Sequence, residues 1–386
     1  MQLEVLGVGG AGCRIADAIR AAESADRSFL TDAFAFDTDE RALNGTVIPE
    51  SHRYQYGRED GLEGEIDRGF DVGRERADEL LERLDRGAPA DADAFLVATG
   101  LGGATGGGTT PALVAGLQRR YDAPVYVLAT LPADREFDSD ADVARTGAGA
   151  RSRSPSGAGS DAVPRPNAAT NAIAAIERLD GLASAIVPVD NEAWLRPGEG
   201  IADARERCNR DVATRVAAVF AGGDSESGGD GTGPVAQNVV DASDVDRIVG
   251  NESAIVALGY GDQAVETSGS RFGLGLVPTE RDVETSEAVR AVETVVRKGI
   301  RGKLTLECDP ETAERGLLIV GGPPAWLNRR AIAEGRRTLQ STVGGSGVLG
   351  GDAPRPDGDA VFAAVVLAGV ESERLEDLRA AAERTD

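Results

Sequence analysis

A run of ten mostly small residues, Gly102–Pro111 (GGATGGGTTP), is the segment best suited to hold an anion. It follows the apolar run 94–98 and precedes a helical pattern at 112–120. Such residues cannot build a core, but they let successive backbone N–H groups point into one concavity beside a helix N-terminus, where a phosphate is favoured. A flexible surface loop is the alternative, and the flanking strand and helix signals weigh against it.

A second glycine turn lies near the start of the chain. Gly7, Gly9 and Gly12 form a G-x-G-x-x-G pattern between a strand-like run at 3–6 and a helical run at 13–22. The spacing is also typical of dinucleotide-binding Rossmann folds, in which an acid such as Asp37 binds a ribose. That interpretation leaves the second glycine loop without a role, and the chain has no GxxxxGK(S/T) pattern of a P-loop. Two glycine loops on neighbouring strands predict one polyphosphate held from two sides.

Both loops resemble those of the tubulin/FtsZ superfamily of GTP-dependent filament proteins. GVGGAG at 7–12 is similar to the first nucleotide loop of FtsZ. GGATGGGTTP is similar to the tubulin signature loop GGGTG(S/T)G, with Ala104 in place of the third glycine. Later segments are similar to the archaeal CetZ branch: VDNEAW (189–194), VVDASDV (239–245), GPPAWLNR (322–329) and GGDAPRPD (350–357). The resemblance covers nearly the whole chain.

The resemblance implies an α/β protein with the tubulin/FtsZ fold. We expect a Rossmann-like GTPase domain at 1–200, a long central helix at 201–222, a smaller α+β domain at 235–371 and a charged, exposed helical tail at 372–386. Residues 138–166 are rich in Ser, Gly and Pro and are expected to form a flexible insertion. Apolar runs predict strands at 3–6, 34–36, 95–98, 125–129, 185–189, 255–258, 304–307, 317–320 and 362–367.

The resemblance also implies which residues contact phosphates. The first loop and the start of its helix would hold the α- and β-phosphates through Gly9, Gly10, Ala11, Gly12, Cys13 and Arg14. The signature loop would face them from the other side through Gly103, Ala104, Thr105, Gly106, Gly107 and Gly108. Glycine lets phosphate oxygens approach the backbone closely. The alternative is that these glycines serve helix packing.

Guanine and ribose require other groups. Guanine offers N–H donors and one carbonyl acceptor, which an asparagine amide complements. By resemblance Asn191 and Asn209 are the two base contacts, and Glu136 is the acid that meets the ribose hydroxyls. Asn191 could equally be an ordinary turn residue, and Asn209 an exposed helix residue.

Acidic residues occur where the terminal phosphate would lie. Glu63 and Glu65 take the place of a family loop that senses that phosphate, and Asp37 and Asp39 stand where FtsZ typically has an N-T-D sequence. A carboxylate repels phosphate unless Mg²⁺ lies between them. These acids could therefore form a magnesium shell, or they could be solvated surface.

Asp241 and Asp244 are the candidate catalytic residues. Their spacing of three places both carboxylates on one face of a helical turn. By resemblance this segment enters the nucleotide pocket of the next subunit, where a carboxylate could orient the attacking water. Hydrolysis would then depend on head-to-tail self-assembly. The alternative is a helix cap by Asp241 that has no catalytic role.

Composition limits the partners and the compartment. The formal net charge of −24 over 386 residues argues against nucleic acid as a partner. Lys298 and Lys303 are the only lysines, and an acidic, lysine-poor surface is typical of a halophilic archaeon. No apolar run in the sequence reaches the length of a membrane span, and no signal peptide is recognisable.

The cysteines and the histidine offer no separate chemistry. Cys13, Cys208 and Cys308 are widely spaced, which indicates reduced thiols in a cytoplasmic protein and no zinc or other metal site. The single histidine, His52, lies in a polar stretch and is expected at the surface.

The sequence therefore predicts a GTP-binding, GTP-hydrolysing cytoskeletal protein that assembles into filaments and controls cell shape. GTP or GDP is the expected ligand, with Mg²⁺ as an option. One alternative is a non-hydrolysing nucleotide-binding scaffold that modulates other tubulin-like proteins. A second is an NAD-dependent Rossmann oxidoreductase, which rests on the first glycine loop alone.

Overall fold

The computed structural model describes residues 1–23, 28–57, 62, 64–137, 165–221, 240–250, 253–266, 283–345 and 347–384. Most of the expected insertion at 138–166 lies outside the described residues, as does Glu63. Within the described part of the chain, no helix is long and apolar enough to cross a membrane.

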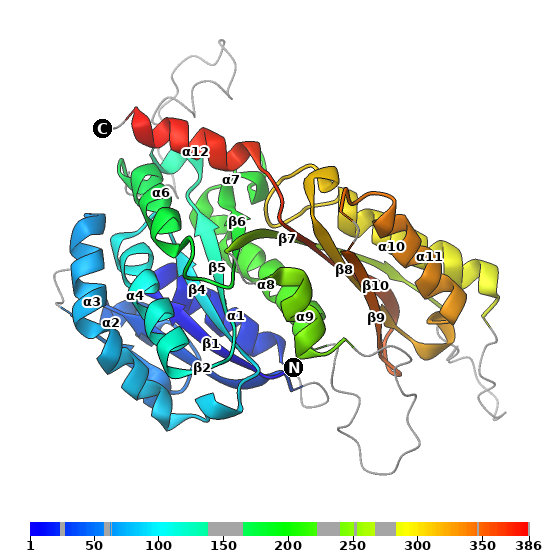
Figure 1. Cartoon of the computed structure of the whole chain (residues 1–386), viewed down its shortest axis with the longest axis horizontal. Coiled ribbons are helices and arrows are strands. Elements are labelled where there is room, and N and C mark those ends of the chain that lie inside the picture. Colours follow the sequence, from blue (N-terminus) through cyan, green and yellow to red (C-terminus); the bar gives the residue numbers. More distant parts are fainter. Residues whose placement is uncertain are drawn as a thin grey trace.

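The N-terminal half is built on a parallel sheet (Figure 1). Its strands are almost entirely buried, as expected of a parallel sheet covered on both faces. Helices α1 and α8 cover one face, and α3, α4 and α6 cover the other. In sheet order the strands are β3 (Arg53–Gln55), β2 (Leu30–Asp37), β1 (Leu3–Val8), β4 (Ala94–Gly100), β5 (Val125–Leu131) and β6 (Ala185–Asp190). The helices are α1 (Gly9–Ala22), α3 (Ile66–Arg83), α4 (Ala104–Arg120), α6 (Ala168–Leu179) and α8 (Ile201–Phe220), with the short α2 (Glu40–Asn44) after β2.

The C-terminal half continues the same sheet. Strand β7 (Ala254–Ala264) pairs in parallel with β6 through two residue pairs and antiparallel with β10 (Ala360–Ala368). Strands β8 (Arg315–Gly322) and β9 (Gly347–Pro354) complete it. Helices α10 (Thr285–Arg301) and α11 (Arg329–Gln340) cover one face, and α9 (Ala242–Val249) lies against the other. Helix α8 lies between the two halves (Figure 1).

Two local expectations for the C-terminal half are wrong. Residues 304–307 form no strand, because their backbone makes isolated bonds rather than a ladder; Thr305, for example, donates from its N–H to Leu258 O at 2.9 Å. The helical pattern at 284–298, with Gly299 just after it, predicts a helix that ends before Gly299, but α10 continues to Arg301. Gly299 lies inside the helix at its contact with the sheet, where a Cβ on Gly299 would lie 2.9 Å from Val365 Cγ2 of β10.

The last helix, α12 (Glu373–Glu383), is not an exposed tail. Leu375, Leu378, Ala381 and Ala382 are buried, and the helix packs against α6. In Figure 1 it runs back from β10 over the N-terminal half. The sequence correctly indicated a helix, but its many charged residues obscured the apolar stripe that docks it.

His52 is another correction. Its side chain is only 13% exposed, with Nδ1 2.9 Å from Asp32 Oδ1 and its ring against Phe34. The 3₁₀ turn Glu50–His52 before β3 brings the ring onto the sheet edge, which a polar local sequence does not reveal.

Candidate functional site

A cleft of about 640 Å³ opens at the carboxyl ends of β1, β4, β5 and β6. The sheet order places β2 and β4 on opposite sides of β1, and ligands of open α/β sheets bind at such switch points. Both glycine loops contribute to the cleft. Of the residues expected from the sequence, those that line it are Gly9, Gly10, Ala11, Arg14, Asp37, Gly103, Ala104, Thr105, Gly106, Glu136 and Asn191.

Two helices begin at the cleft without a side-chain cap. Helix α1 begins at Gly9 and α4 at Ala104; neither has an acid in its first turn, and no described side chain caps either helix. In α4 the N–H of Gly107 already donates to Gly103 O at 3.0 Å, so the donors left over are those of the first three residues. Two positive helix ends with free N–H groups therefore face one cleft, which is an anion-binding arrangement.

The glycines at the contact between the two loops are sterically required. Gly9 has a φ of +70°, and a Cβ there would lie 2.9 Å from Gly106 N. A Cβ on Gly106 would lie 2.7 Å from Thr99 Oγ1 of β4. Only residues without a side chain allow the two helix ends to come this close.

Gly12 and Cys13 lie behind the cleft and do not line it. A Cβ on Gly12 would lie 2.1 Å from Ala98 O, so this glycine lets α1 pack on β4. Cys13 Sγ lies 3.5 Å from the carbonyl oxygens of Gly7 and Phe36, and burial raises the thiol pKa. The thiol therefore stays protonated and faces the core.

Gly107 and Gly108 also lie outside the cleft, and they have the packing role that was the alternative for these glycines. A Cβ on Gly108 would lie 2.4 Å from the carbonyl carbon of Gly69 in α3. One turn further on, a Cβ on Gly73 would lie 2.9 Å from Gly108 O. Helices α3 and α4 thus cross with their backbones in contact. The four-residue spacing of Gly69 and Gly73 is the signal that our sequence interpretation overlooked.

Asn171 of α6 was not expected from the sequence. Its side chain is buried and lines the cleft, with Nδ2 donating to Gly64 O at 2.9 Å and to Gly102 O at 3.2 Å. It thereby holds the signature loop to the loop before α3. No motif marks this residue, because its partners are distant in sequence.

In the described part of the chain, three arginines from separate elements line the cleft: Arg14 of α1, Arg165 before α6 and Arg205 of α8. Burial lowers the pKa of Arg14 and of Arg165, and the nearby charge of Arg205 lowers both further. Mutual repulsion of this kind is relieved by a bound anion. Arg165 and Arg205 carry no local motif and were not expected from the sequence.

Two acids line the cleft as well. Glu136 is buried, pairs with Arg165 and accepts from Ala133 N at 2.9 Å. Asp37 accepts from Thr38 N at 2.7 Å, and burial raises its pKa. The other expected acids lie apart, since Asp39 caps α2 by accepting from Arg41 N at 2.9 Å and Glu65 is exposed outside the cleft. Among the described residues no group of three or more His, Cys, Asp or Glu side chains could hold a metal ion.

The two asparagines do not line the same cavity. Asn191 is the first residue of the short helix α7 (Asn191–Trp194) and lines the cleft. Asn209 lines a neighbouring groove of about 780 Å³ between α1 and α8. The two cavities meet at Arg14 and Arg205, which line both.

Asp241 and Asp244 lie at the start of α9, away from the cleft. Asp241 caps the helix, accepting from Ser243 Oγ at 2.7 Å and from Asp244 N at 2.9 Å, and these hydrogen bonds lower its pKa. Capping is the structural alternative to catalysis for Asp241. Within one chain neither carboxylate can act on a ligand of the cleft.

Comparisons with known proteins agree with this architecture. The GTPase domain model of the Tubulin/FtsZ family matches residues 2–150, and the model of the C-terminal domain of tubulin-like CetZ matches residues 198–384. The tubulin-like protein CetZ5 of Haloferax volcanii is 32% identical over 99% of this chain and 91% of its own length. This chain belongs to the CetZ family of tubulin-like proteins. CetZ3 of the same organism is 31% identical over 100% of this chain and 92% of its own length.

Solved structures of CetZ proteins share the fold. The GDP-bound monomer of CetZ1 from Haloferax volcanii superposes with a TM-score of 0.78 at 26% identity, covering 100% of both chains. The GTPγS-bound protofilament of CetZ2 from that organism has a TM-score of 0.77 at 24% identity, covering 100% of this chain and 98% of its own. The family and fold implied by the motifs are thereby confirmed. The oxidoreductase alternative loses its basis, since it rested on one of two loops that line the same cleft.

Proposed function

We propose that this CetZ-family protein binds GTP and GDP in the cleft and hydrolyses GTP when it assembles head-to-tail into filaments. The observation that carries the proposal is the convergence of two uncapped helix N-termini on one cleft. The CetZ1 relative with GDP and the CetZ2 protofilament with GTPγS support it. We further propose that the filament serves cell shape in the cytoplasm of a halophilic archaeon, in keeping with the charge of −24 and the Haloferax relatives.

In this proposal the backbone supplies the phosphate contacts. The N–H groups of residues 9–11 and 104–106 bind phosphate oxygens, and Arg14 and Arg165 offset the charge. Asn191 contacts the guanine edge, and Glu136 accepts from ribose hydroxyls. The base extends toward the boundary marked by Arg205, beyond which Asn209 lies.

The cleft fits Mg²⁺ only together with a nucleotide. Glu136 already pairs with Arg165, so among the described residues Asp37 is the cleft-lining carboxylate left to bind a cation. Magnesium in nucleotide sites commonly uses one or two carboxylates, substrate phosphates and water. When bound, the ion would neutralise phosphate charge. Phosphate oxygens of the nucleotide and water would supply most of its ligands.

Hydrolysis would require a neighbouring subunit. Asp241 is engaged in capping α9 and so holds the start of that helix in place. Asp244, in the same first turn, is then the residue that we propose orients the attacking water in the cleft of the next subunit. A repeated contact between two different surfaces propagates into a filament.

The first test is nucleotide identity and turnover. We expect the purified protein to carry guanine nucleotide, and phosphate release per subunit to rise steeply with protein concentration. Asp244→Ala should abolish that release while leaving GTP binding intact. Bound GTP without turnover at any concentration would instead support a non-hydrolysing scaffold that modulates other tubulin-like proteins.

A mixing experiment tests whether the site is shared between subunits. Asp244→Ala keeps an intact cleft, whereas Gly103→Leu places a side chain at the cleft, where a Cβ has 3.8 Å of room to Gly100 O. Each variant alone should be inactive. Their mixture should recover part of the activity, because some junctions combine a good cleft with a good acid. No recovery, with both variants folded and co-assembled, would contradict a shared site.

A further inference from the structure

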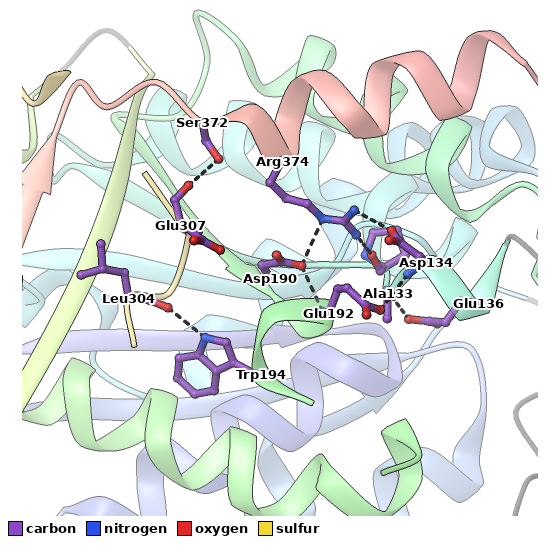
Figure 2. A network of polar contacts seen from close by, with 11 residues as sticks. Ala133, Asp134, Glu136, Asp190, Glu192, Trp194, Leu304, Glu307, Ser372 and Arg374 are labelled. Atoms are coloured by element: carbon purple, nitrogen blue, oxygen red, sulfur yellow. Dashed lines mark hydrogen bonds and ion pairs between the residues drawn. The ribbon is translucent and has the colours of Figure 1, made fainter. Parts of the chain in front are cut away.

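Arg374, in the first turn of α12, reaches into the loops that border the cleft (Figure 2). Its Nε donates to Asp190 Oδ1 at 3.2 Å, its Nη1 to Asp134 Oδ1 at 2.6 Å and its Nη2 to Pro132 O at 2.7 Å. The side chain is only 11% exposed. One guanidinium near the end of the chain therefore joins the carboxyl end of β5 to that of β6.

Each acceptor of Arg374 either lines the cleft or lies within two residues of a residue that does. Pro132 lines it directly, Asp134 lies two residues before Glu136, and Asp190 immediately precedes Asn191. A planar guanidinium with three fixed donor directions sets the separation of these loops. It thereby sets where Glu136 and Asn191 stand relative to each other.

The acids around Arg374 depend on its charge. Asp190 is 4% exposed; burial raises its pKa, and the charge of Arg374 opposes that shift. Burial by itself lowers the pKa of Arg374, but the charges of Asp190 and Asp134 outweigh this and raise it overall. Glu192 adds a third carboxylate, since its Oε2 accepts from Asp134 N at 3.1 Å. Without the guanidinium, the carboxylates of Asp134, Asp190 and Glu192 would repel one another, and that of Asp190 would be buried without a cation beside it.

The rest of the network anchors this arrangement in the C-terminal half. Ser372 Oγ donates to Glu307 O at 2.7 Å, and Trp194 Nε1 donates to Leu304 O at 2.9 Å (Figure 2). Asp190 N donates to Thr305 O at 2.8 Å. The irregular segment 304–307 therefore accepts hydrogen bonds both from the start of α12 and from the residues at and after the end of β6.

We propose that Arg374 is a positioning residue for nucleotide recognition. It holds Glu136 and Asn191 in the geometry that accepts a guanine nucleoside, so α12 is part of the nucleotide-binding unit although it lies at the other end of the chain. The inference rests on the proposed function, because it names a residue that positions the nucleotide-recognition groups of that same cleft.

The test compares three variants of the full chain at high salt: Arg374→Met, Arg374→Lys and Arg379→Met. Arg379 is the matched control, an exposed arginine on the same helix. Titration with fluorescent GDP and ADP should show GDP binding about tenfold weaker in Arg374→Met, with the preference for GDP over ADP reduced by a similar factor. Arg374→Lys should lie between, because it keeps the charge without the fork. The control should bind as the wild type does.

Hydrogen exchange provides a readout that needs no nucleotide. In Arg374→Met the amides of 131–137 and 190–194 should exchange faster, while those of α12 keep their protection. Wild-type GDP affinity and selectivity in Arg374→Met, or unchanged exchange in both loops, would overturn the inference. If Arg374→Met does not fold, the same comparison is made with Arg374→Lys. Wild-type protein that binds no guanine nucleotide would overturn the proposed function instead, and the exchange rates would still decide the role of Arg374.

Discussion

The two sides of the cleft are built in different ways. On the glycine side, formed by residues 9–11 and 103–106, backbone groups at two helix ends face the cleft and side chains are almost absent. On the arginine-held side, formed by residues 131–136 and 190–194, the side chains of Glu136 and Asn191 line the cleft and Arg374 of α12 joins the loops. The first side needs room for close backbone contact, whereas the second needs charge compensation between distant segments.

This difference suggests a division of labour. Backbone N–H groups at helix ends suit phosphate, which every nucleotide carries. Side-chain amides and carboxylates distinguish one base and sugar from another. Damage to the glycine side should therefore affect folding and all nucleotide binding, whereas damage to the arginine-held side should affect selectivity.

The largest effect, a loss of stability, is expected where the helix of the glycine side packs on the sheet. Gly12→Ala would place a Cβ 2.1 Å from Ala98 O, and a backbone carbonyl cannot easily move. We expect a loss of about 3 kcal/mol or more in the free energy of unfolding, measured by denaturant titration. Gly45→Ala is the control, since its Cβ would keep 3.5 Å from Ala42 O. Equal stability of the two variants would show that the close packing of α1 on β4 is not needed.

The strand beneath the glycine side should make stability depend on pH. Glu4 of β1 is fully buried, and burial, with a smaller effect of Asp32, raises its pKa from 4.5 to about 8. Between these values the folded state keeps a proton that the unfolded state releases, so stability falls as pH rises. From pH 5 to pH 7 the loss is on the order of 3 kcal/mol.

Glu4→Gln removes this titration. The difference in stability between the variant and the wild type should grow in favour of the variant from pH 5 to pH 8, as followed by thermal or denaturant unfolding. Glu82→Gln, the same substitution on the exposed face of α3, is the matched control. A constant difference between Glu4→Gln and the wild type would contradict a raised pKa at Glu4.

A moderate effect is expected at Asn171, which joins the glycine side to α6. Asn171→Ala removes the bonds to Gly64 O and Gly102 O and leaves two carbonyl groups without this donor. We expect GDP and ADP to bind about tenfold more weakly and to a similar degree, because the phosphate side is loosened. Calorimetric titration measures both affinities, with the exposed Asn44→Ala as control. A loss of affinity for GDP but not for ADP would contradict the assignment of phosphate binding to the glycine side.

The smallest effect lies outside both sides, at the start of α9. Asp241→Ala removes an N-cap and should lower the free energy of unfolding by about 1 kcal/mol, whereas Asp244→Ala should change it little. Thermal unfolding of the two variants measures the difference. Equal stabilities would mean that the Asp241 cap contributes nothing, and Asp241 would return as a candidate for direct catalysis.

Sequence patterns captured the elements better than the contacts between them. The glycine loops, the strands β1, β2, β4, β5 and β6 and the helix at 201–220 follow from local spacing and apolar runs, and the structure contains them. The sequence analysis did not predict β3, whose three residues include no apolar run. The apolar alternation at 304–307 predicts a strand that the structure does not contain, because such an alternation does not reveal whether a partner strand is present. The segment at 372–386 has a short apolar stripe among many charged residues, so the sequence predicts an exposed helix where the structure shows a packed one.

By itself, the sequence determined the glycine side: small residues at helix starts dictate backbone geometry locally, and motif spacing records that geometry. Only the tertiary structure decided which of those glycines face the cleft and which let α3 and α4 cross. It also decided the arginine-held side, because Arg374 lies 184 residues from Asp190 and 240 from Asp134 along the chain. Charge compensation over such separations arises only when β10 returns α12 across the N-terminal half, and no local pattern encodes that return.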